Sequence, residues 1–195
     1  YGAKLANLFS TEFIVETVDD ERKLKYYQVF SENMKKKTKP VIEEYNEYPF
    51  TRFKFHPDYK RFDMKGMDDS TYQLFKKRAW DTAAWVGKEV KVTFNGEEIK
   101  TNSFQSYSKM YIGDLKDYAH EKCNEKWEII ATYNSNEVFE QVSFVNGINT
   151  IRGGKHVDYI VKQIADKLIE LMKKAPYKSR TQGINIKDTY VKNQL

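Results

Sequence analysis

The amino-acid sequence predicts an α+β protein. Its 195 residues are 40% hydrophobic and 15% aromatic, which is enough apolar material for a folded core. Runs of alternating apolar side chains, typical of strands, are separated by runs with apolar residues three and four apart, typical of helices. The pair Asn95-Gly96, which stands between two strand-like runs, indicates a tight hairpin because both residues tolerate positive φ.

The first part of the chain predicts a helix followed by a small sheet. A helix is expected over 1–10, strands over 11–18 and 24–30 around a polar turn, and a third strand over 50–55. Polar residues and two prolines between the second and third strands indicate a loop. A second helix is expected over 69–85, since apolar side chains recur on one face and a glycine follows shortly after.

The second part of the chain ends in the clearest helix signal. Residues 101–126 are expected to be irregular or weakly helical, and 127–133 and 138–145 to form two strands. The stretch 155–174 keeps apolar residues three and four apart for five turns, which predicts a long amphipathic helix. A polar, basic loop is expected over 175–190.

Positive charge is concentrated at the end of the chain. Residues 1–151 carry 23 Lys and Arg against 24 Asp and Glu, whereas residues 152–195 carry 10 against 4. A polyanionic partner is therefore expected to bind the last 44 residues, the alternative being a solvated basic face without a partner. No apolar run approaches the roughly 18 residues that a membrane helix needs, so no membrane partner is predicted.

Signatures of several common active sites are absent. The sequence has no P-loop, no dinucleotide-binding glycine motif and no nucleophile elbow. The three histidines, His56, His120 and His156, stand far apart, and none lies beside a second ligand at metal-binding spacing. The single cysteine, Cys123, excludes an intramolecular disulfide and a cysteine-rich zinc site. No metal site and no catalytic residue are predicted within the chain.

The first four residues form a candidate anion site. In Tyr1-Gly2-Ala3-Lys4, two small residues precede an amphipathic helix and leave backbone N–H groups at its positive end. Lys4 adds a point charge that suits a phosphate. The alternative is a frayed N-terminus that binds nothing, as is common at chain ends.

Residues 143–160 run from a strand through a glycine pair into the long helix. Gly153-Gly154 permits a tight turn with positive φ, but the spacing does not identify a ligand. The stretches Ser-Phe-Val-Asn at 143–146 and Gly-Gly-Lys-His-Val-Asp-Tyr-Ile at 153–160 closely resemble the transducer segment of eukaryotic-type DNA topoisomerase II. His156 is expected to be structural and to satisfy backbone groups near the glycine pair.

The opening of the chain resembles the same family. Residues 1–10 (YGAKLANLFS) are similar to the end of its ATP-binding signature, and 11–17, 31–34 and 94–96 also match in order. The chain is identified as a member of the cellular or large-DNA-virus branch of DNA topoisomerase II. Because it opens without an initiator Met, we expect it to be part of a longer protein.

This resemblance implies a two-part architecture. Residues 1–102 correspond to the C-terminal part of a Bergerat-type ATPase domain, of the kind shared by gyrase, Hsp90 and MutL. Residues 103–195 correspond to an α/β transducer domain with a left-handed β-α-β crossover, incomplete at its C-terminal end. The boundary near residue 102 agrees with the irregular stretch that the sequence places there.

The resemblance also implies an activity for the parent protein. That activity is ATP-dependent passage of one DNA duplex through a transient double-strand break in another. By position, Tyr1, Gly2, Ala3 and Lys4 match the end of the family's triphosphate loop and are the expected ATP-binding residues. The family's Mg²⁺ ligand and general base lie outside this chain, so ATP and Mg²⁺ are cofactors of the parent and the isolated chain is predicted to be inactive.

The partners implied by the resemblance are double-stranded DNA and a second copy of the parent protein. Lys173, Lys174 and Ala175 match positions that face the DNA path, and Ala175 stands where a further Lys is usual. A cellular enzyme is expected in the nucleus, and a viral one in the host cytoplasm or the virion.

Two other functions stay open at this point. The basic C-terminal stretch and the incomplete active site are also compatible with a non-enzymatic DNA-binding or interaction module. Another Bergerat-type ATPase, such as a MutL-like protein, would keep the fold and change the function. The Ser-Phe-Val-Asn and Gly-Gly-x-His-Val pairing favours the topoisomerase.

Overall fold

The structure is a computed structural model that describes residues 1–113, 117–174 and 176–195. The described residues form two compact units, Tyr1–Tyr72 (unit 1) and Gln73–Leu195 (unit 2). Both contain helices and strands, which confirms the α+β class. Among the described helices, none is long and apolar enough to cross a membrane.

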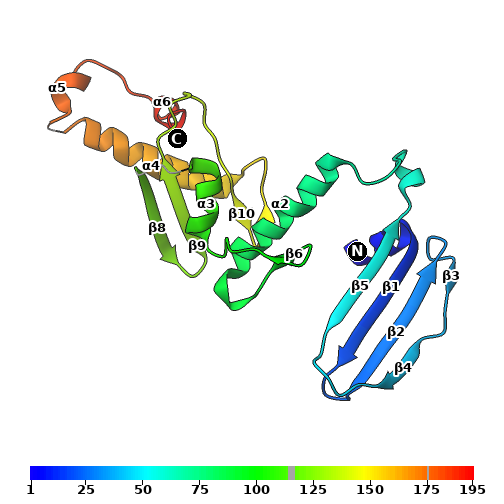
Figure 1. The fold of residues 1–195 in the computed structure, drawn as a ribbon. Coiled ribbons are helices and arrows are strands. Elements are labelled where there is room, and N and C mark those ends of the chain that lie inside the picture. The colour runs from blue at the N-terminus through cyan, green and yellow to red at the C-terminus, as the bar shows by residue number, and fades with distance from the viewer. Residues whose placement is uncertain (114–116, 175) are drawn as a thin grey trace. The chain divides into compact units, whose positions relative to one another are not determined.

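Unit 1 is built on one antiparallel sheet (Figure 1). Its central strand β1 (Ser10–Asp19) pairs with β2 (Leu24–Ser31) on one side and with β5 (Thr51–Pro57) on the other. The outer edge of β2 carries two short strands, β3 (Lys36–Lys37) and β4 (Val41–Glu44). The predicted hairpin and third strand are therefore confirmed. The stretch predicted as a loop also holds β3 and β4, which the sequence pattern missed because both are short and solvent-exposed.

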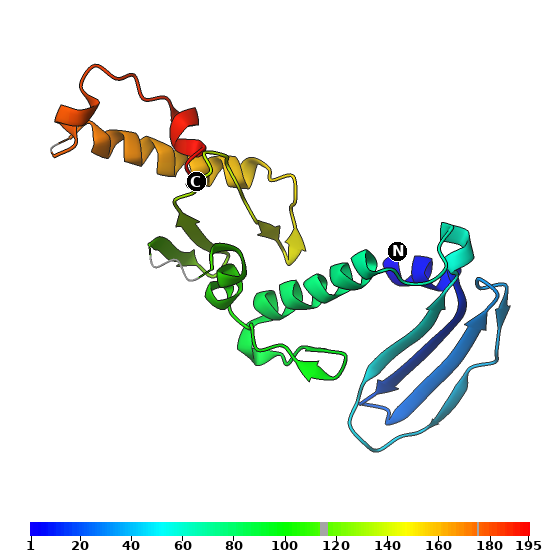
Figure 2. The same ribbon diagram turned by 45° about the horizontal axis from the view of Figure 1, so that its top comes forward.

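Aromatic side chains make the core of this sheet. Phe13 on β1 is buried, and its ring lies 5.8 Å from that of Phe55 and 5.9 Å from that of Phe53, both on β5. Helix α1 (Gly2–Leu8) lies at the end of the sheet where β1 begins, as Figure 2 shows. A 3₁₀ helix (Tyr59–Phe62) follows β5. The predicted N-terminal helix is thus confirmed.

Helix α2 (Asp69–Val86) connects the units along the chain, and the division between them falls inside it. The predicted helix at this place is confirmed. The predicted domain boundary near residue 102 lies within unit 2; it concerns domains of a larger protein and stays a prediction.

Unit 2 contains three two-stranded antiparallel hairpins and four further helices besides most of α2, counted over the described residues. A 3₁₀ helix (Gly87–Glu89) follows α2. The hairpins are β6 (Thr93–Phe94) with β7 (Glu97–Glu98), β8 (Tyr118–Asn124) with β9 (Trp127–Thr132), and β10 (Phe144–Val145) with β11 (Ile148–Asn149). The helices are α3 (Phe104–Ile112), α4 (Lys155–Met172), α5 (Lys178–Thr181) and α6 (Asp188–Lys192).

The stretch expected to be irregular or weakly helical contains a regular helix. Helix α3 begins with a capping box: the Ser103 hydroxyl accepts from the Ser106 N–H at 3.1 Å, and the Ser106 hydroxyl accepts from the Ser103 N–H at 3.2 Å. Such reciprocal bonds satisfy two of the N–H groups that a helix start leaves free. The same stretch contains β8, whose polar, exposed side chains give no alternating pattern.

The prediction of a strand over 138–145 is wrong except for Phe144–Val145. Strand β9 pairs with β8 instead. Backbone groups of the intervening chain bond to the C-terminal residues, with the Asn134 N–H donating to the Gln194 carbonyl at 2.8 Å and the Glu140 N–H to the Leu195 carbonyl at 3.1 Å. These long-range partners, which local pattern cannot reveal, hold the segment out of the sheet.

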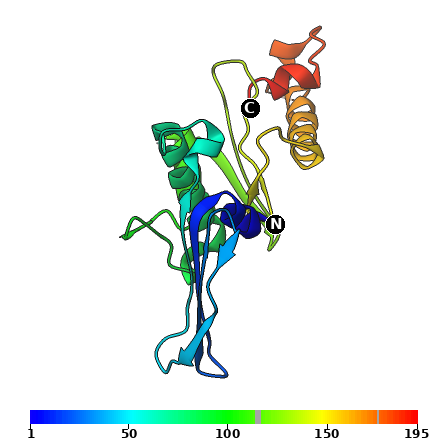
Figure 3. The ribbon, with the colours of Figure 1, turned by 90° about the vertical axis from the view of Figure 1, so that its right-hand side faces the viewer.

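The long amphipathic helix is confirmed as α4, which ends two residues before the predicted limit. Ala165 on its apolar face is 1% exposed, and α6 packs beside it (Figure 3). The predicted basic loop contains the short helix α5 and the start of α6. The described strands pair only antiparallel, so the left-handed β-α-β crossover stays a prediction.

Candidate functional site

The N-terminal segment presents free backbone donors. Helix α1 begins at Gly2, and its first intrahelical bond runs from the Leu5 N–H to the Tyr1 carbonyl at 2.9 Å. The N–H groups of Gly2, Ala3 and Lys4 precede that bond, and within the described chain no side chain caps this helix start. All four residues from Tyr1 to Lys4 are exposed. The segment therefore has the donors and the open backbone that an anion such as a triphosphate requires.

The glycine-rich segment before α4 is held together by side-chain hydroxyls. His156 Nε2 lies 3.1 Å from Thr150 Oγ1 and 3.3 Å from Ser143 Oγ, and these two hydroxyls also bond to each other. The ring thus joins the residues flanking the β10–β11 hairpin to the first turn of α4. The structural role expected for His156 is present, but its partners are hydroxyls rather than the backbone of the glycine pair.

The turn of the β10–β11 hairpin packs directly on α2. Gly147 has φ +74°, and a Cβ built on it would lie 2.9 Å from the Trp85 ring. The Gly147 carbonyl accepts a hydrogen bond from Arg78 Nη1 at 2.8 Å. Only a glycine allows both the backbone conformation and this close approach.

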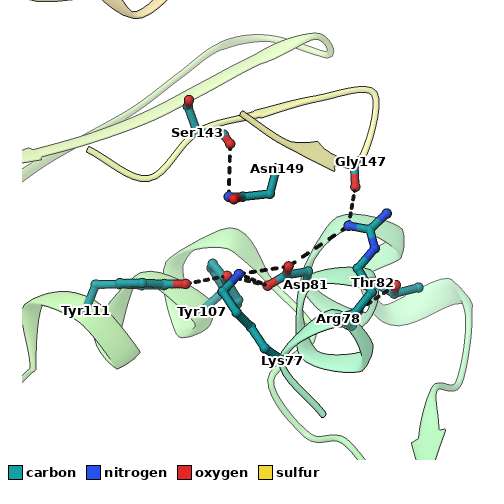
Figure 4. A network of polar contacts seen from close by, with 9 residues as sticks. All are labelled: Lys77, Arg78, Asp81, Thr82, Tyr107, Tyr111, Ser143, Gly147 and Asn149. Atoms are coloured by element: carbon teal, nitrogen blue, oxygen red, sulfur yellow. Dashed lines mark hydrogen bonds and ion pairs between the residues drawn. The ribbon is translucent and has the colours of Figure 1, made fainter. Parts of the chain in front are cut away.

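A buried carboxylate on α2 lies beside this contact (Figure 4). Asp81 is 4% exposed and accepts from Lys77 Nζ at 2.9 Å and from Tyr107 Oη at 2.6 Å. Arg78 Nη1 lies 4.0 Å from the same carboxylate. Tyr111 Oη is 2.8 Å from Tyr107 Oη, and it must donate there because the Tyr107 proton is directed at Asp81.

Burial and its neighbours keep Tyr107 protonated. Desolvation raises the pKa of the Tyr107 hydroxyl far above its usual range, and the hydrogen bonds to Asp81 and Tyr111 raise that pKa further. The ring also packs edge-on against Phe144 of β10, with centroids 5.8 Å apart. Tyr107 is therefore a fixed donor that ties α3 to both α2 and the hairpin.

Sequence pattern did not single out Asp81, Arg78 or Tyr107. A signal for the first was present, because Asp81 is the sole charged residue in the otherwise apolar or small stretch 79–86. Its partner Tyr107 stands 26 positions away on another helix, and such a contact cannot be found from local spacing.

The end of α4 carries the predicted basic positions. Lys173 and Lys174 are exposed, directly after the helix. Lys174 Nζ donates to Glu170, and this bond together with that from Lys167 lowers the pKa of the Glu170 carboxyl to about 2. Ala175, the third position predicted to face DNA, lies outside the described residues.

The groove between the β8–β9 hairpin, α4 and α6 does not suit a nucleotide. It has a volume of about 810 Å³ and is lined mainly by apolar and tyrosine side chains, among them Tyr118, Ile164, Leu168 and Val191. Its described lining contains no Lys or Arg to neutralise phosphates. Elsewhere in the described chain, no three His, Cys, Asp or Glu side chains gather as a metal site would need.

Comparison with known proteins defines the class to which this fold belongs. The ATPase and transducer domains of DNA topoisomerase II from Balamuthia mandrillaris superpose with a TM-score of 0.86 at 32% identity, covering all of this chain and 49% of that one. The ATPase region of Saccharomyces cerevisiae topoisomerase II gives 0.82 at 36% identity, again over all of this chain and 49% of that one. The fold is that of the ATPase and transducer region of type II topoisomerases.

The sequence places the chain in a family. The family described as DNA gyrase B matches residues 87–195, more than half of the chain, and the chain belongs to this family. It is homologous over its whole length to eukaryotic DNA topoisomerase 2, with 42% identity over 204 residues to the Arabidopsis thaliana protein. The chain spans 13% of that relative, so the relative contains much that this chain does not.

Proposed function

We propose that this chain is part of an ATP-dependent type II DNA topoisomerase, in which it supplies the end of the triphosphate loop and couples nucleotide state to the DNA gate. The observation that carries the proposal is the match over the whole chain, in sequence and in structure, to the ATPase and transducer region of DNA topoisomerase II. Because the chain is a small part of these relatives, the activity belongs to the full-length protein that carries it.

We infer that the nucleotide contact of this chain is made by Tyr1, Gly2, Ala3 and Lys4. The uncapped N–H groups at the start of α1 and the exposed Lys4 support this assignment. ATP, when bound, supplies the free energy for strand passage, and Mg²⁺ is proposed to be held by residues outside this chain. Residues 1–4 would bind and orient phosphate oxygens.

The proposed macromolecular partners are duplex DNA and a second copy of the full-length protein. Lys173 and Lys174, with Ala175, are the proposed DNA contact, supported by the basic excess of the last 44 residues. Since the relatives are eukaryotic, the nucleus is the proposed location.

ATP hydrolysis tests this proposal. The full-length protein is expected to hydrolyse ATP with Mg²⁺, faster in the presence of duplex DNA, and the isolated 195-residue chain is expected to show no hydrolysis. Activity of the isolated chain would mean that the catalytic groups are misplaced here. Absence of ATP hydrolysis by the full-length protein would favour a non-enzymatic DNA-binding module.

The proposed DNA contact predicts a change in salt dependence. Each lysine that neutralises a phosphate contributes roughly 0.9 to the slope of log affinity against log salt on duplex DNA. Replacing Lys173 and Lys174 together by Ala in the full-length protein is therefore expected to reduce this slope by about two. The measurement is binding to a duplex by fluorescence anisotropy at several salt concentrations.

A matched control lies on the same helix. Lys155 and Lys162 are exposed on the first half of α4 and share no partner with Lys173 or Lys174, and their joint replacement by Ala removes the same charge. This control is expected to leave the slope unchanged. An equal reduction in both double variants would assign the effect to net charge and contradict a contact at the helix end.

A further inference from the structure

Three elements that lie apart in the sequence meet at the Asp81 carboxylate of unit 2. Tyr107 brings α3 to it through a hydrogen bond of 2.6 Å, and Phe144 brings β10 to it by packing against the Tyr107 ring. Arg78, three residues before Asp81 on α2, donates to the Gly147 carbonyl at the tip of the same hairpin (Figure 4). Helix α2 is therefore fixed to the β10–β11 hairpin at two points, its tip and its base.

The hairpin continues this connection to α4. Ser143 and Thr150 flank its two strands, and both hydroxyls contact the His156 ring in the first turn of α4. Polar contacts at its tip and at its base thus join the hairpin to α2 and to α4, the helix whose other end carries Lys173 and Lys174.

We propose that Asp81 is a positioning residue for energy coupling, which locks the β10–β11 hairpin and the start of α4 to α2 so that a displacement of α2 is passed on to α4. This inference rests on the proposed function, because it describes how that nucleotide-driven cycle is transmitted. Asp81 touches neither of the segments proposed to bind nucleotide and DNA, and it acts through Tyr107 and Arg78.

The chemistry at Asp81 suits a residue that passes on a displacement of α2 better than one that only stabilises the folded unit. Replacing a buried ion pair by well-packed apolar side chains is often neutral or stabilising, so holding three elements together does not by itself need a carboxylate. The carboxylate adds a directional bond between helices, because it accepts from Tyr107 Oη of α3 at 2.6 Å. Lys77 and Arg78, from its own helix, lie 2.9 Å and 4.0 Å from it and keep the carboxylate paired. Elements joined in this way move as one body rather than slide past one another.

The test uses the full-length protein with three substitutions. Asp81→Asn keeps the shape and removes the charge. Arg78→Ala removes the bond to the hairpin tip and the 4.0 Å ion pair with Asp81, at a side chain that is half exposed, and it leaves the Tyr107–Asp81 bond in place. Asp166→Asn, which breaks the exposed pair with Lys162 on α4, is the control. For each protein, the rate of ATP hydrolysis without DNA and the number of supercoils removed per ATP are measured.

If Asp81 couples ATP hydrolysis to strand passage, its replacement should lower the number of supercoils removed per ATP while the rate of ATP hydrolysis without DNA stays nearly the same. Asp81→Asn is expected to lower the supercoils removed per ATP about five-fold or more, the lower end of typical coupling between sites, with hydrolysis without DNA changed less than about two-fold. Arg78→Ala is expected to act in the same direction, and Asp166→Asn to match the unmodified protein.

Two results would overturn the inference. One is an unchanged number of supercoils per ATP, and the other is a parallel loss of hydrolysis and relaxation, which is the signature of a merely structural role. Should Asp81→Asn fail to fold, Arg78→Ala decides by the same criteria. If the unmodified protein shows no ATP-dependent relaxation, the proposed function is refuted, and the inference with it. If the unmodified protein relaxes DNA and the variants remove as many supercoils per ATP as it does, only the role of Asp81 is refuted.

Discussion

Replacing Gly147 by Ala is expected to lower the free energy of unfolding of unit 2 by about 2–4 kcal/mol. The position has φ +74°, which costs a residue with a Cβ about 1–2 kcal/mol. The new methyl group would also lie 2.9 Å from the Trp85 ring, and such overpacking costs about 1–3 kcal/mol. Urea unfolding followed by tryptophan fluorescence measures the change, since all three tryptophans lie in unit 2.

A second hairpin of the same unit provides the control. Asn95-Gly96 forms a turn with φ values of 52° and 82°, close to the 50° and 74° of Asn146-Gly147, and the space around a Cβ at Gly96 is open. Gly96→Ala should therefore cost only the backbone strain, about 1–2 kcal/mol. Equal losses in the two variants would show that Trp85 does not pack against the β10–β11 turn.

Replacing Asp81 by Ala is expected to destabilise unit 2 by about 2–3 kcal/mol. Removing one partner of a fully buried ion pair commonly costs 3–5 kcal/mol, roughly, because a charge stays behind without compensation. Here Lys77 and Arg78 are about half exposed and can be hydrated again, so the loss falls mainly on the buried Tyr107 hydroxyl and on the space left empty. Urea unfolding again measures the change.

The control for this substitution is an aspartate on a solvent-facing helix surface that, like Asp81, is paired with a lysine four residues earlier. Asp166 accepts from Lys162 four residues earlier but is more than half exposed, and its replacement by Ala is expected to change stability by less than about 0.5 kcal/mol. A loss at Asp81 no larger than at Asp166 would contradict the buried network. Combining Asp81→Ala with Tyr107→Phe should cost less than the sum of the two, because both remove the same bond.

Elements whose partners are close in sequence could be predicted from residue pattern. Apolar and polar side chains alternate along β1 and β2, which are joined by a polar turn, and α4 keeps one apolar face over its whole length. The sequence pattern therefore predicts both the hairpin and the helix. Residues 138–143 also looked like a strand. Within this segment the Glu140 N–H donates to the Leu195 carbonyl, more than fifty residues away, and the local sequence pattern gives no sign of that partner.

The candidate sites likewise differ in whether their residues are close together in the sequence. Tyr1 to Lys4 and the segment around Gly153-Gly154 could be singled out because small residues before a helix are a local signal. The cluster at Asp81 depends on Tyr107, Phe144 and Gly147, which come from three separate elements and converge only in the folded unit. The only local sign of this cluster in the sequence is the isolated charge of Asp81 among apolar and small residues.

Relaxation of a negatively supercoiled plasmid by the full-length protein tests the proposed activity most directly. Passing one duplex through a double-strand break in another changes the linking number by two, so a single topoisomer should give products that differ from it in steps of two. These products should form only when ATP and Mg²⁺ are both present. Relaxation without nucleotide, or products separated by steps of one, would contradict an ATP-coupled type II topoisomerase.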